Sequence, residues 1–270
     1  MKKERLIESS VYKHQKWPIP EYDDKNQPHI LFVLSPPYSG STALTRILNT
    51  SNHTMILQPD GEGQWLIPGL SGENRWDPDM YVNYQSVKAV WLNKYQKISQ
   101  LVGDIDVVIE KSPPNIMRIE KLSSMFRYTS FLANNRDPYA NCASVLYRTP
   151  TVGKMKAEQR KEVLVNLARK WVIRSKKIEE WTRLFRAPLL TYEEFCRDTT
   201  LLLDKLNIPQ NAIDTIDLQA SVKVKDYPKQ RISNQNDRQI SNLSKTEIGK
   251  ISTVLSPESK LLEFFGYQVR

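Results

Sequence analysis

The sequence predicts a doubly wound α/β domain, which is a parallel sheet with helices on both faces. Short apolar, β-leaning runs recur along the chain, and this composition is typical of strands buried on both faces of a parallel sheet. The runs are followed by turns and then by residues with helical spacing, the alternation that builds such sheets. The predicted strands are residues 29–34, a short strand that ends near residue 57, and residues 106–110, 129–134 and 187–191.

The size and composition of the chain fit one such domain with an N-terminal arm. The chain has 270 residues, of which 40% are hydrophobic and 26% are charged, so it can bury a full core. Residues 1–28 are polar and contain Pro18, Pro20 and Pro28, so we expect an arm there rather than a domain. Residues 29–270 are then the α/β domain.

Targeting and redox signals predict a soluble protein of the cytoplasm. No run approaches the roughly 20 apolar residues that span a bilayer, and the opening MKKERLIESS has no apolar stretch long enough for a signal peptide. Cys142 and Cys196 are far apart and the histidines form no cluster, so neither a disulfide framework nor a zinc site is indicated. We expect no metal and no membrane partner.

The chain is basic, with a formal net charge of +9, which suits a protein that binds polyanions. Charge alone does not separate a nucleic acid from a phosphorylated cofactor. The basic stretch Lys154–Lys177 interleaves its charges with apolar residues at helical spacing, which favours the solvated face of an amphipathic helix. We therefore expect no nucleic-acid partner.

The stretch Ser35–Leu48 follows the first predicted strand and has the pattern of an anion-binding loop. A turn over Ser35–Gly40 leads into helical spacing from Ser41. A strand, a tight turn with glycine and a helix N-terminus aim backbone N–H groups and a positive helix end into one small space, which suits phosphate or sulfate. The loop lacks the lysine of a nucleotide-triphosphatase P-loop.

Within this loop, Pro37, Ser39, Gly40, Ser41 and Thr42 form a P-x-S-G-S-T pattern. The pattern resembles the 5′-phosphosulfate loop of sulfotransferases that use 3′-phosphoadenosine 5′-phosphosulfate (PAPS). The resemblance implies a P-loop-like α/β fold, PAPS as the donor substrate, no metal, and donor contacts from Tyr38 to Thr42. Tyr38 itself departs from the family, which usually has a cation there to meet the sulfonate or the 5′-phosphate.

A glycine-rich turn after the second predicted strand carries two carboxylates, Asp60 and Glu62. The run GEGQWLIP resembles the segment of tyrosylprotein sulfotransferases in which a glutamate after a glycine is the catalytic base. This resemblance implies that Glu62 takes the proton from the acceptor hydroxyl, and we expect Trp65 to shield the carboxylate from water. The alternative is that both carboxylates cap or solvate a turn.

Lys111 follows the third predicted strand in the run EKSP. The run resembles the Lys-(Thr/Asp/Ser)-Pro element of the family, whose lysine contacts the bridging or leaving oxygen. The resemblance implies that Lys111 neutralises charge on the leaving phosphate during in-line transfer. Because Tyr38 replaces the usual cation, we expect Lys111 to carry more of the electrostatic work, with Arg46 too far along its helix to help. The alternative is an ordinary surface lysine.

Arg136-Asp137-Pro138 follows the fourth predicted strand, and Ser144 stands eight residues after the arginine. An arginine at a strand end can fork onto a phosphate, a proline can open the next helix, and a serine two turns along can reach the same group. This arrangement resembles the 3′-phosphate element of the family. The resemblance implies that Arg136 and Ser144 bind the 3′-phosphate of PAPS.

Two further donor contacts are implied near the end of the chain. Tyr192 follows the fifth predicted strand, where family members carry a tyrosine near the adenine. Lys229 and Arg231 lie in the stretch before the last helices, where the family often closes a basic loop over the nucleotide. The match is loose here, and we select Arg231 as the candidate 3′-phosphate contact.

Together these features predict a PAPS-dependent sulfotransferase that acts on an acceptor hydroxyl. The acceptor is open: a carbohydrate, a small metabolite, a lipid and a peptide tyrosine all fit, and the sequence does not indicate an oligomeric state. One alternative is a nucleotide or small-molecule kinase, which would need a lysine in the first loop and carboxylates for magnesium. Another is a catalytically idle domain that binds 3′-phosphoadenosine 5′-phosphate (PAP) without turnover.

Overall fold

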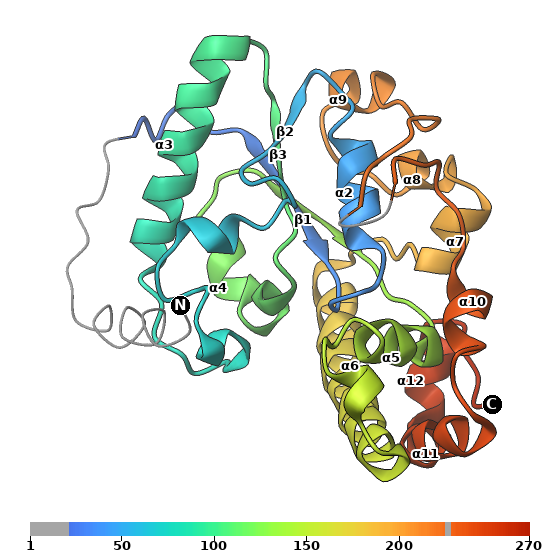
Figure 1. The fold of residues 1–270 in the computed structure, drawn as a ribbon. Helices are drawn as coiled ribbons and strands as arrows, with labels where there is room; N and C mark the ends of the chain where they lie inside the picture. Colours follow the sequence, from blue (N-terminus) through green and yellow to red (C-terminus); the bar gives the residue numbers. More distant parts are fainter. Residues whose placement is uncertain (1–21, 225–227) are drawn as a thin grey trace. The chain divides into compact units, whose positions relative to one another are not determined.

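The computed structural model of the chain describes residues 22–224 and 228–270 (Figure 1). The predicted arm, residues 1–28, lies outside the described residues except for residues 22–28. Contacts within the chain divide it into two compact units. The first unit contains residues 22–34, Leu44–Phe131 and Asn207–Ala220, and the second contains Ser35–Ala43, Leu132–Leu206 and Ser221–Arg270.

The core of the fold is a parallel sheet of four strands in the order β2-β3-β1-β4, flanked by helices. The strands are β1 (His29–Leu34), β2 (Thr54–Ile56), β3 (Val107–Glu110) and β4 (Thr129–Ala133). Both β1 and β2 pair with β3, and His29 and Thr54 are each in register with Val107. The α/β fold class and the first four predicted strands are therefore confirmed.

Helices fill the connections between strands and most of the chain after β4 (Figure 1). The α-helices are α2 (Ser41–Leu48), α3 (Tyr84–Val102), α4 (Ile119–Ser123), α5 (Pro138–Leu146), α6 (Ala157–Phe185), α7 (Tyr192–Arg197), α8 (Leu201–Asp204), α9 (Gln210–Asp214), α10 (Asn236–Ile240), α11 (Lys245–Leu255) and α12 (Ser259–Phe264). The 3₁₀ helices are η1 (Gly63–Leu66), η2 (Glu73–Trp76), η3 (Pro113–Met117), η4 (Val152–Lys154) and η5 (Ser256–Glu258).

The predicted fifth strand, residues 187–191, is wrong. The segment forms a single parallel bridge, Ala133 with Leu189. Its hydrogen bonds run from Ala133 N–H to the Pro188 carbonyl and from Leu190 N–H to the Ala133 carbonyl, each at 2.9 Å. Pro188 has no N–H to donate, so a regular ladder does not extend through it.

In the first unit, α3 and the strands bury an aromatic core. Trp91 on α3 is 1% exposed and stacks on Phe126 with ring centroids 5.7 Å apart, and Phe126 lies 6.3 Å from Phe32 on β1. The Asn83 side chain caps the start of α3 by accepting from Ser86 N–H at 3.1 Å. The helix runs from this cap to Val102.

The chain after β3 forms two short helical pieces, η3 and α4, which meet at Arg118. Two prolines at the start of η3 remove backbone donors, and Arg118 takes φ −146° at the junction. The Arg118 side chain is 4% exposed because its guanidinium donates to three carbonyls, those of Pro114, Arg75 and Asp77. This arginine therefore ties η2 to η3.

In the second unit, α6 is the long amphipathic helix that the basic stretch predicted. It packs against α5, α11 and α12. Its buried residues recur every three or four positions and include Leu164, Ala168, Trp171, Ser175 and Ile178. Among the helices that the structure describes, none combines the length and the apolar composition needed to cross a membrane.

Candidate functional site

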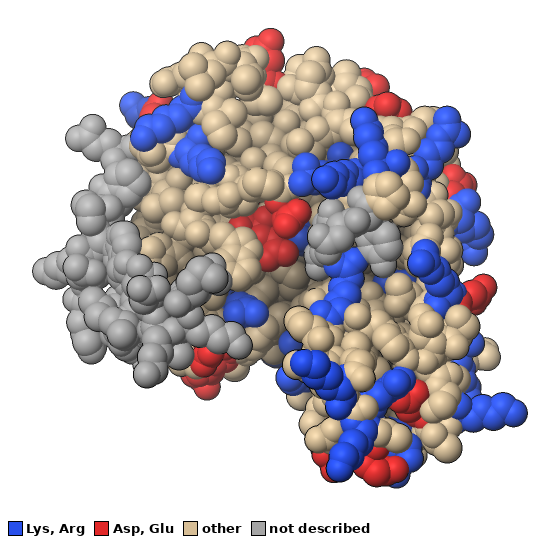
Figure 2. Space-filling view, in the orientation of Figure 1, with Lys and Arg blue, Asp and Glu red and all other residues tan. Residues whose placement is uncertain are grey.

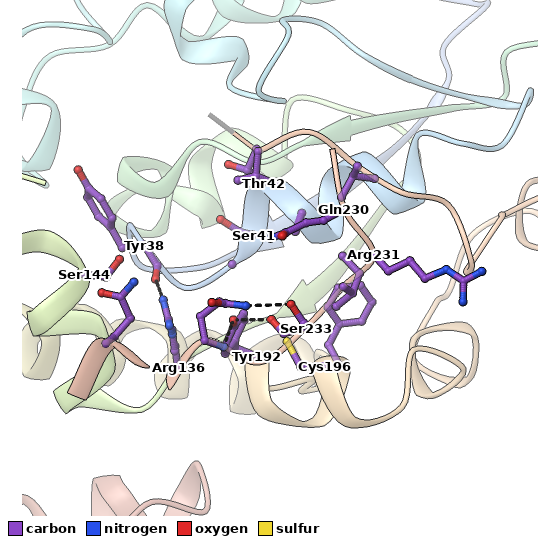
Figure 3. A pocket seen from close by; sticks show the side chains of 18 of the residues that line it. Tyr38, Ser41, Thr42, Arg136, Ser144, Tyr192, Cys196, Gln230, Arg231 and Ser233 are labelled. Carbon is purple, nitrogen blue, oxygen red and sulfur yellow. Dashed lines mark hydrogen bonds between the residues drawn. The ribbon is translucent and has the colours of Figure 1, made fainter. Parts of the chain in front are cut away.

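The second unit contains a pocket that gathers most of the predicted donor-binding residues (Figure 3). Its walls come from the loop between β1 and α2, from α5 and α7, and from the segment before α10. The predicted residues that line it are Tyr38, Gly40, Ser41, Thr42, Arg136, Ser144, Tyr192 and Arg231. Ser39 is fully buried in the same loop. The pocket therefore joins residues that are up to 193 positions apart in the sequence.

The loop has a backbone shape that only a few residues tolerate. Gly40 has φ +77°, and a Cβ there would lie 2.3 Å from Cδ2 of Tyr192, so glycine is required both for the turn and for the approach of the ring. Tyr38 also has a positive φ, 64°. The Asn141 side chain on α5 fixes the loop by donating to the Pro37 carbonyl at 2.8 Å. The loop leads directly into α2 at Ser41.

Arg136 is poised to bind an anion. It is 5% exposed, and its Nε donates to Asn236 Oδ1 at 2.8 Å. Its Nη1 donates to the Tyr38 carbonyl at 3.1 Å (Figure 3). Its Nη2 is buried and has no hydrogen-bond partner among the described residues. A buried, unsatisfied donor on a charged group is costly, so this atom is suited to a ligand oxygen.

Tyr192 holds the pocket together. Its ring is 7% exposed because Gly40 lies against it and the Arg136 guanidinium sits 4.3 Å from its centroid. Its hydroxyl donates to the Ser233 carbonyl at 3.1 Å and accepts from Gln235 N–H at 3.0 Å. Burial raises the pKa of Tyr192, so the hydroxyl keeps its proton. Tyr192 therefore connects the loop, Arg136 and the segment before α10. Its contact with an adenine stays a prediction.

Arg231 lies at the rim of the pocket. Its side chain is exposed, and in Figure 3 its guanidinium points away from Arg136 and Ser144. Contact of Arg231 with the 3′-phosphate therefore also stays a prediction.

Sequence reasoning missed Arg148, which also lines the pocket. Its guanidinium lies 5.9 Å from the centroid of the Tyr38 ring. Arg148 lies two residues beyond the end of α5, so helical spacing from Ser144 does not reach it, and only its contact with Tyr38 identifies it. The positive charge that the loop lacks at Tyr38 is thus supplied beside it by Arg148.

The positive charge of the chain belongs to this second unit. By sequence it holds 24 of the 39 lysines and arginines but 14 of the 30 acidic residues, a balance of +10, which leaves −1 for the first unit. Figure 2 shows many basic side chains over the region of α5, α6 and α11. Such a field attracts multiply charged anions to the unit that carries the pocket.

The first unit brings together the two predicted catalytic residues, Glu62 and Lys111. Lys111 Nζ donates to Glu62 Oε1 at 3.0 Å, and the side chains are 1% and 20% exposed. Lys111 is therefore buried in an ion pair, which contradicts the alternative of an ordinary surface lysine. Arg46 lies 3.7 Å from Asp60 in an exposed pair of the same unit.

The second carboxylate oxygen of Glu62 is held by neighbouring residues. Gln64 Nε2 donates to Glu62 Oε2 at 2.8 Å, and Trp65 Nε1 donates to the same atom at 3.0 Å. Trp65 is itself 52% exposed and contacts the carboxylate through the N–H at the edge of its ring. Shielding of Glu62 by Trp65 therefore stays a prediction.

The turn that carries Glu62 is fixed to the end of β3 by backbone groups. Lys111 N–H donates to the Gly61 carbonyl at 2.8 Å, and Gly63 N–H donates to Glu110 Oε2 at 2.9 Å. Trp91 Nε1 donates to the Gly63 carbonyl at 3.1 Å. A Cβ at Gly63 would lie 2.5 Å from Glu110 Oε2, so the close contact requires glycine. Sequence reasoning treated Glu110 only as a strand end.

Comparison with known proteins finds a shared fold. No family model matches the sequence, and no curated protein matches it either. A solved sulfotransferase from Alicyclobacillus acidocaldarius aligns over 90% of this chain and 97% of its own, with a TM-score of 0.53 and 14% identity. Sulfotransferase STF9 from Mycobacterium avium aligns over 98% and 83%, with a TM-score of 0.50 and 13% identity. The chain therefore has the fold of these sulfotransferases.

Glu110 predicts a specific pH dependence of stability. Burial raises the pKa of Glu110 to about 8 from an ordinary 4.5, opposed by hydrogen bonds from Ser112 and Gly63. The folded protein then binds a proton more tightly than the unfolded chain, so stability falls as pH rises from 4.5 to 8 and levels off above 8. The glutamine in Glu110→Gln does not titrate in this range. The melting temperature of the variant relative to that of wild type should therefore increase as pH rises from 5 to 8.

Thermal unfolding of both proteins at several pH values tests this prediction. A difference in melting temperature that stays constant across the range would contradict it. The size of the shift in the Glu110 pKa limits the change in the free energy of unfolding to a few kcal/mol.

Proposed function

We propose that the protein is a sulfotransferase that moves the sulfuryl group of PAPS to an acceptor hydroxyl. One observation carries the proposal: Arg136, whose Nη2 has no hydrogen-bond partner in the described part of the chain, lies with Ser144 and the Ser39–Thr42 loop around one pocket of a sulfotransferase fold. Two anion-binding elements in one pocket suit a donor that has phosphate groups at both ends of a nucleoside.

The pocket residues fit the chemistry of PAPS. The backbone amides of the loop and the N-terminus of α2 would hold the 5′-phosphosulfate. Arg136 and Ser144 would hold the 3′-phosphate, with Nη2 giving the hydrogen bond that it lacks here. Tyr192 and Arg231 would line the nucleoside side, and Arg148 would add the charge that Tyr38 does not provide.

The transfer itself needs a base and a cation. Glu62 takes the proton from the acceptor hydroxyl as its oxygen bonds to sulfur, and the bond from sulfur to the bridging oxygen breaks in line. The products are a sulfate ester and PAP, and the proton stays on Glu62 until solvent removes it. Lys111 offsets the negative charge that grows on the leaving oxygen. The 3.0 Å contact between Lys111 Nζ and Glu62 Oε1 places the proposed cation beside the proposed base.

The kinase alternative has less support, because the loop carries no lysine and the fold neighbours are sulfotransferases. The idle-domain alternative shares the donor site. It differs in predicting no turnover and no effect of Glu62 on any reaction.

The first prediction concerns donor binding. The protein should bind PAP more tightly than ATP or AMP. Arg136→Lys should weaken the affinity for PAP about 10- to 100-fold, because lysine keeps the charge but cannot make bidentate hydrogen bonds. Ser144→Ala should weaken it less. Isothermal calorimetry measures both, with Arg169→Ala on the exposed face of α6 as the matched control. Equal binding of ATP, or an unchanged affinity in Arg136→Lys, would overturn the donor assignment.

The second prediction concerns the missing loop cation. Arg148→Ala should weaken binding of PAPS about tenfold, and adding Tyr38→Arg to that variant should restore most of the loss. The double change moves one positive charge across the 5.9 Å contact between the two side chains. Full affinity in Arg148→Ala alone would show that this arginine does not serve the donor.

The third prediction separates chemistry from binding. Glu62→Gln should lower kcat by about 10²- to 10⁴-fold while PAP affinity stays unchanged. Lys111→Met removes the cation without leaving a large cavity and should cost about 3 kcal/mol of barrier, roughly 10²-fold. The assay follows PAP release from PAPS with a panel of hydroxyl acceptors, and circular dichroism checks that each variant is folded. A kcat for Lys111→Met within a few-fold of wild type would refute its role.

A further inference from the structure

The surface beside Glu62 contains an exposed tryptophan. Trp65 is 52% exposed, although its indole N–H lies 3.0 Å from Glu62 Oε2. Leaving so much apolar ring in water is unfavourable, since aromatic side chains gain most from burial. We call Gln64, Trp65 and Arg75 the Trp65 platform.

The residues of the platform are held by contacts with their neighbours. The Trp65 ring is fixed at its edge by Glu62, and the Arg75 guanidinium lies 5.9 Å from the ring centroid. Arg75 Nη1 in turn donates to the Gly72 carbonyl at 3.2 Å. The buried Arg118 holds the backbone of Arg75 by donating to its carbonyl at 2.8 Å. Such preorganisation lowers the entropy cost of binding a partner on the ring.

Gln64 adds a polar group at the same place. Its side chain is 2% exposed and its Nε2 donates to Glu62 Oε2 at 2.8 Å, so its amide lies at the carboxylate. Its Oε1 is buried and has no hydrogen-bond partner among the described residues. A buried acceptor without a donor is costly, so this oxygen is available to a ligand N–H or O–H.

We infer that the Trp65 platform is the acceptor-binding surface and that it selects acceptors whose hydroxyl stands on a six-membered ring. This inference rests on the proposed function. A ring laid against the exposed indole brings its hydroxyl to Glu62, because the indole edge and the carboxylate are one hydrogen bond apart. Gln64 Oε1 accepts from a second polar hydrogen of the acceptor. A flexible alkyl chain gains less from an open, flat ring face.

Two kinds of molecule share this chemistry, phenols and pyranose sugars. Both present a flat face to an indole, the phenol through its π-system and the sugar through its C–H bonds. The test therefore compares para-cresol, methyl glucopyranoside and hexanol as acceptors for PAPS. The kcat/KM for cresol or for the glucoside should exceed the kcat/KM for hexanol by about tenfold or more. The ring compound with the higher kcat/KM shows whether the acceptor class is a phenol or a pyranose sugar.

Variants locate the effect on the platform. Trp65→Ala should raise KM for the preferred ring acceptor about tenfold and leave KM for hexanol unchanged. Trp65→Phe keeps an aromatic ring face, so the low KM for the ring acceptor should be retained. The variant loses the indole N–H, so any decrease in its kcat measures the contribution of the hydrogen bond to Glu62. Tyr81→Ala is the control, because Tyr81 is an 81% exposed aromatic residue of the same unit.

The outcomes separate this inference from the proposed function. If wild type does not bind PAP in calorimetry, the proposed function fails. If every variant binds PAP and hexanol is sulfated as well as the rings, or is sulfated while no ring is, the platform inference alone is overturned. If PAP binds but no acceptor of any kind is sulfated, the proposed function fails with it. An equal rise of KM in Tyr81→Ala would also overturn it.

Discussion

The pocket of the second unit depends on one packing contact, the Tyr192 ring between the Gly40 backbone and the Arg136 guanidinium. A Cβ at residue 40 would lie 2.3 Å from that ring, and the guanidinium lies 4.3 Å from its centroid. The same tyrosine holds residues 233 and 235 through its hydroxyl. One side chain therefore contacts the loop, the strand end and the segment before α10. It also packs on the Arg136 guanidinium, whose Nη2 has no hydrogen-bond partner among the residues that the structure describes.

The two units differ in net charge and in the kind of charged groups that they contain. The second unit has the excess of basic residues and the unsatisfied donor, which suit a highly charged ligand. The first unit is close to neutral and holds a compensated pair, Glu62 with Lys111, on a turn tied to the end of β3. In the proposed function, the basic residues of the second unit bind the donor. Glu62 and Lys111 of the first unit act on the acceptor and on the leaving oxygen.

The sequence predicted the strands and the residues at their ends, because buried parallel strands are locally apolar and the ends carry the polar side chains. It failed where the outcome depends on distant partners. Residues 187–191 have strand composition, but Pro188 limits the pairing to one bridge. Arg148 was missed because its value depends on the Tyr38 ring, 110 positions away. Glu110 was missed because only the folded turn shows that Gly63 needs its carboxylate.

The buried pair of Lys111 and Glu62 also bears on how relatives of this protein can be read. An isolated charge in a buried site destabilises a fold by several kcal/mol, so losing either partner is selected against whether or not the chain catalyses anything. Retention of both residues in a relative would therefore not by itself be evidence of catalysis, because the fold needs the pair.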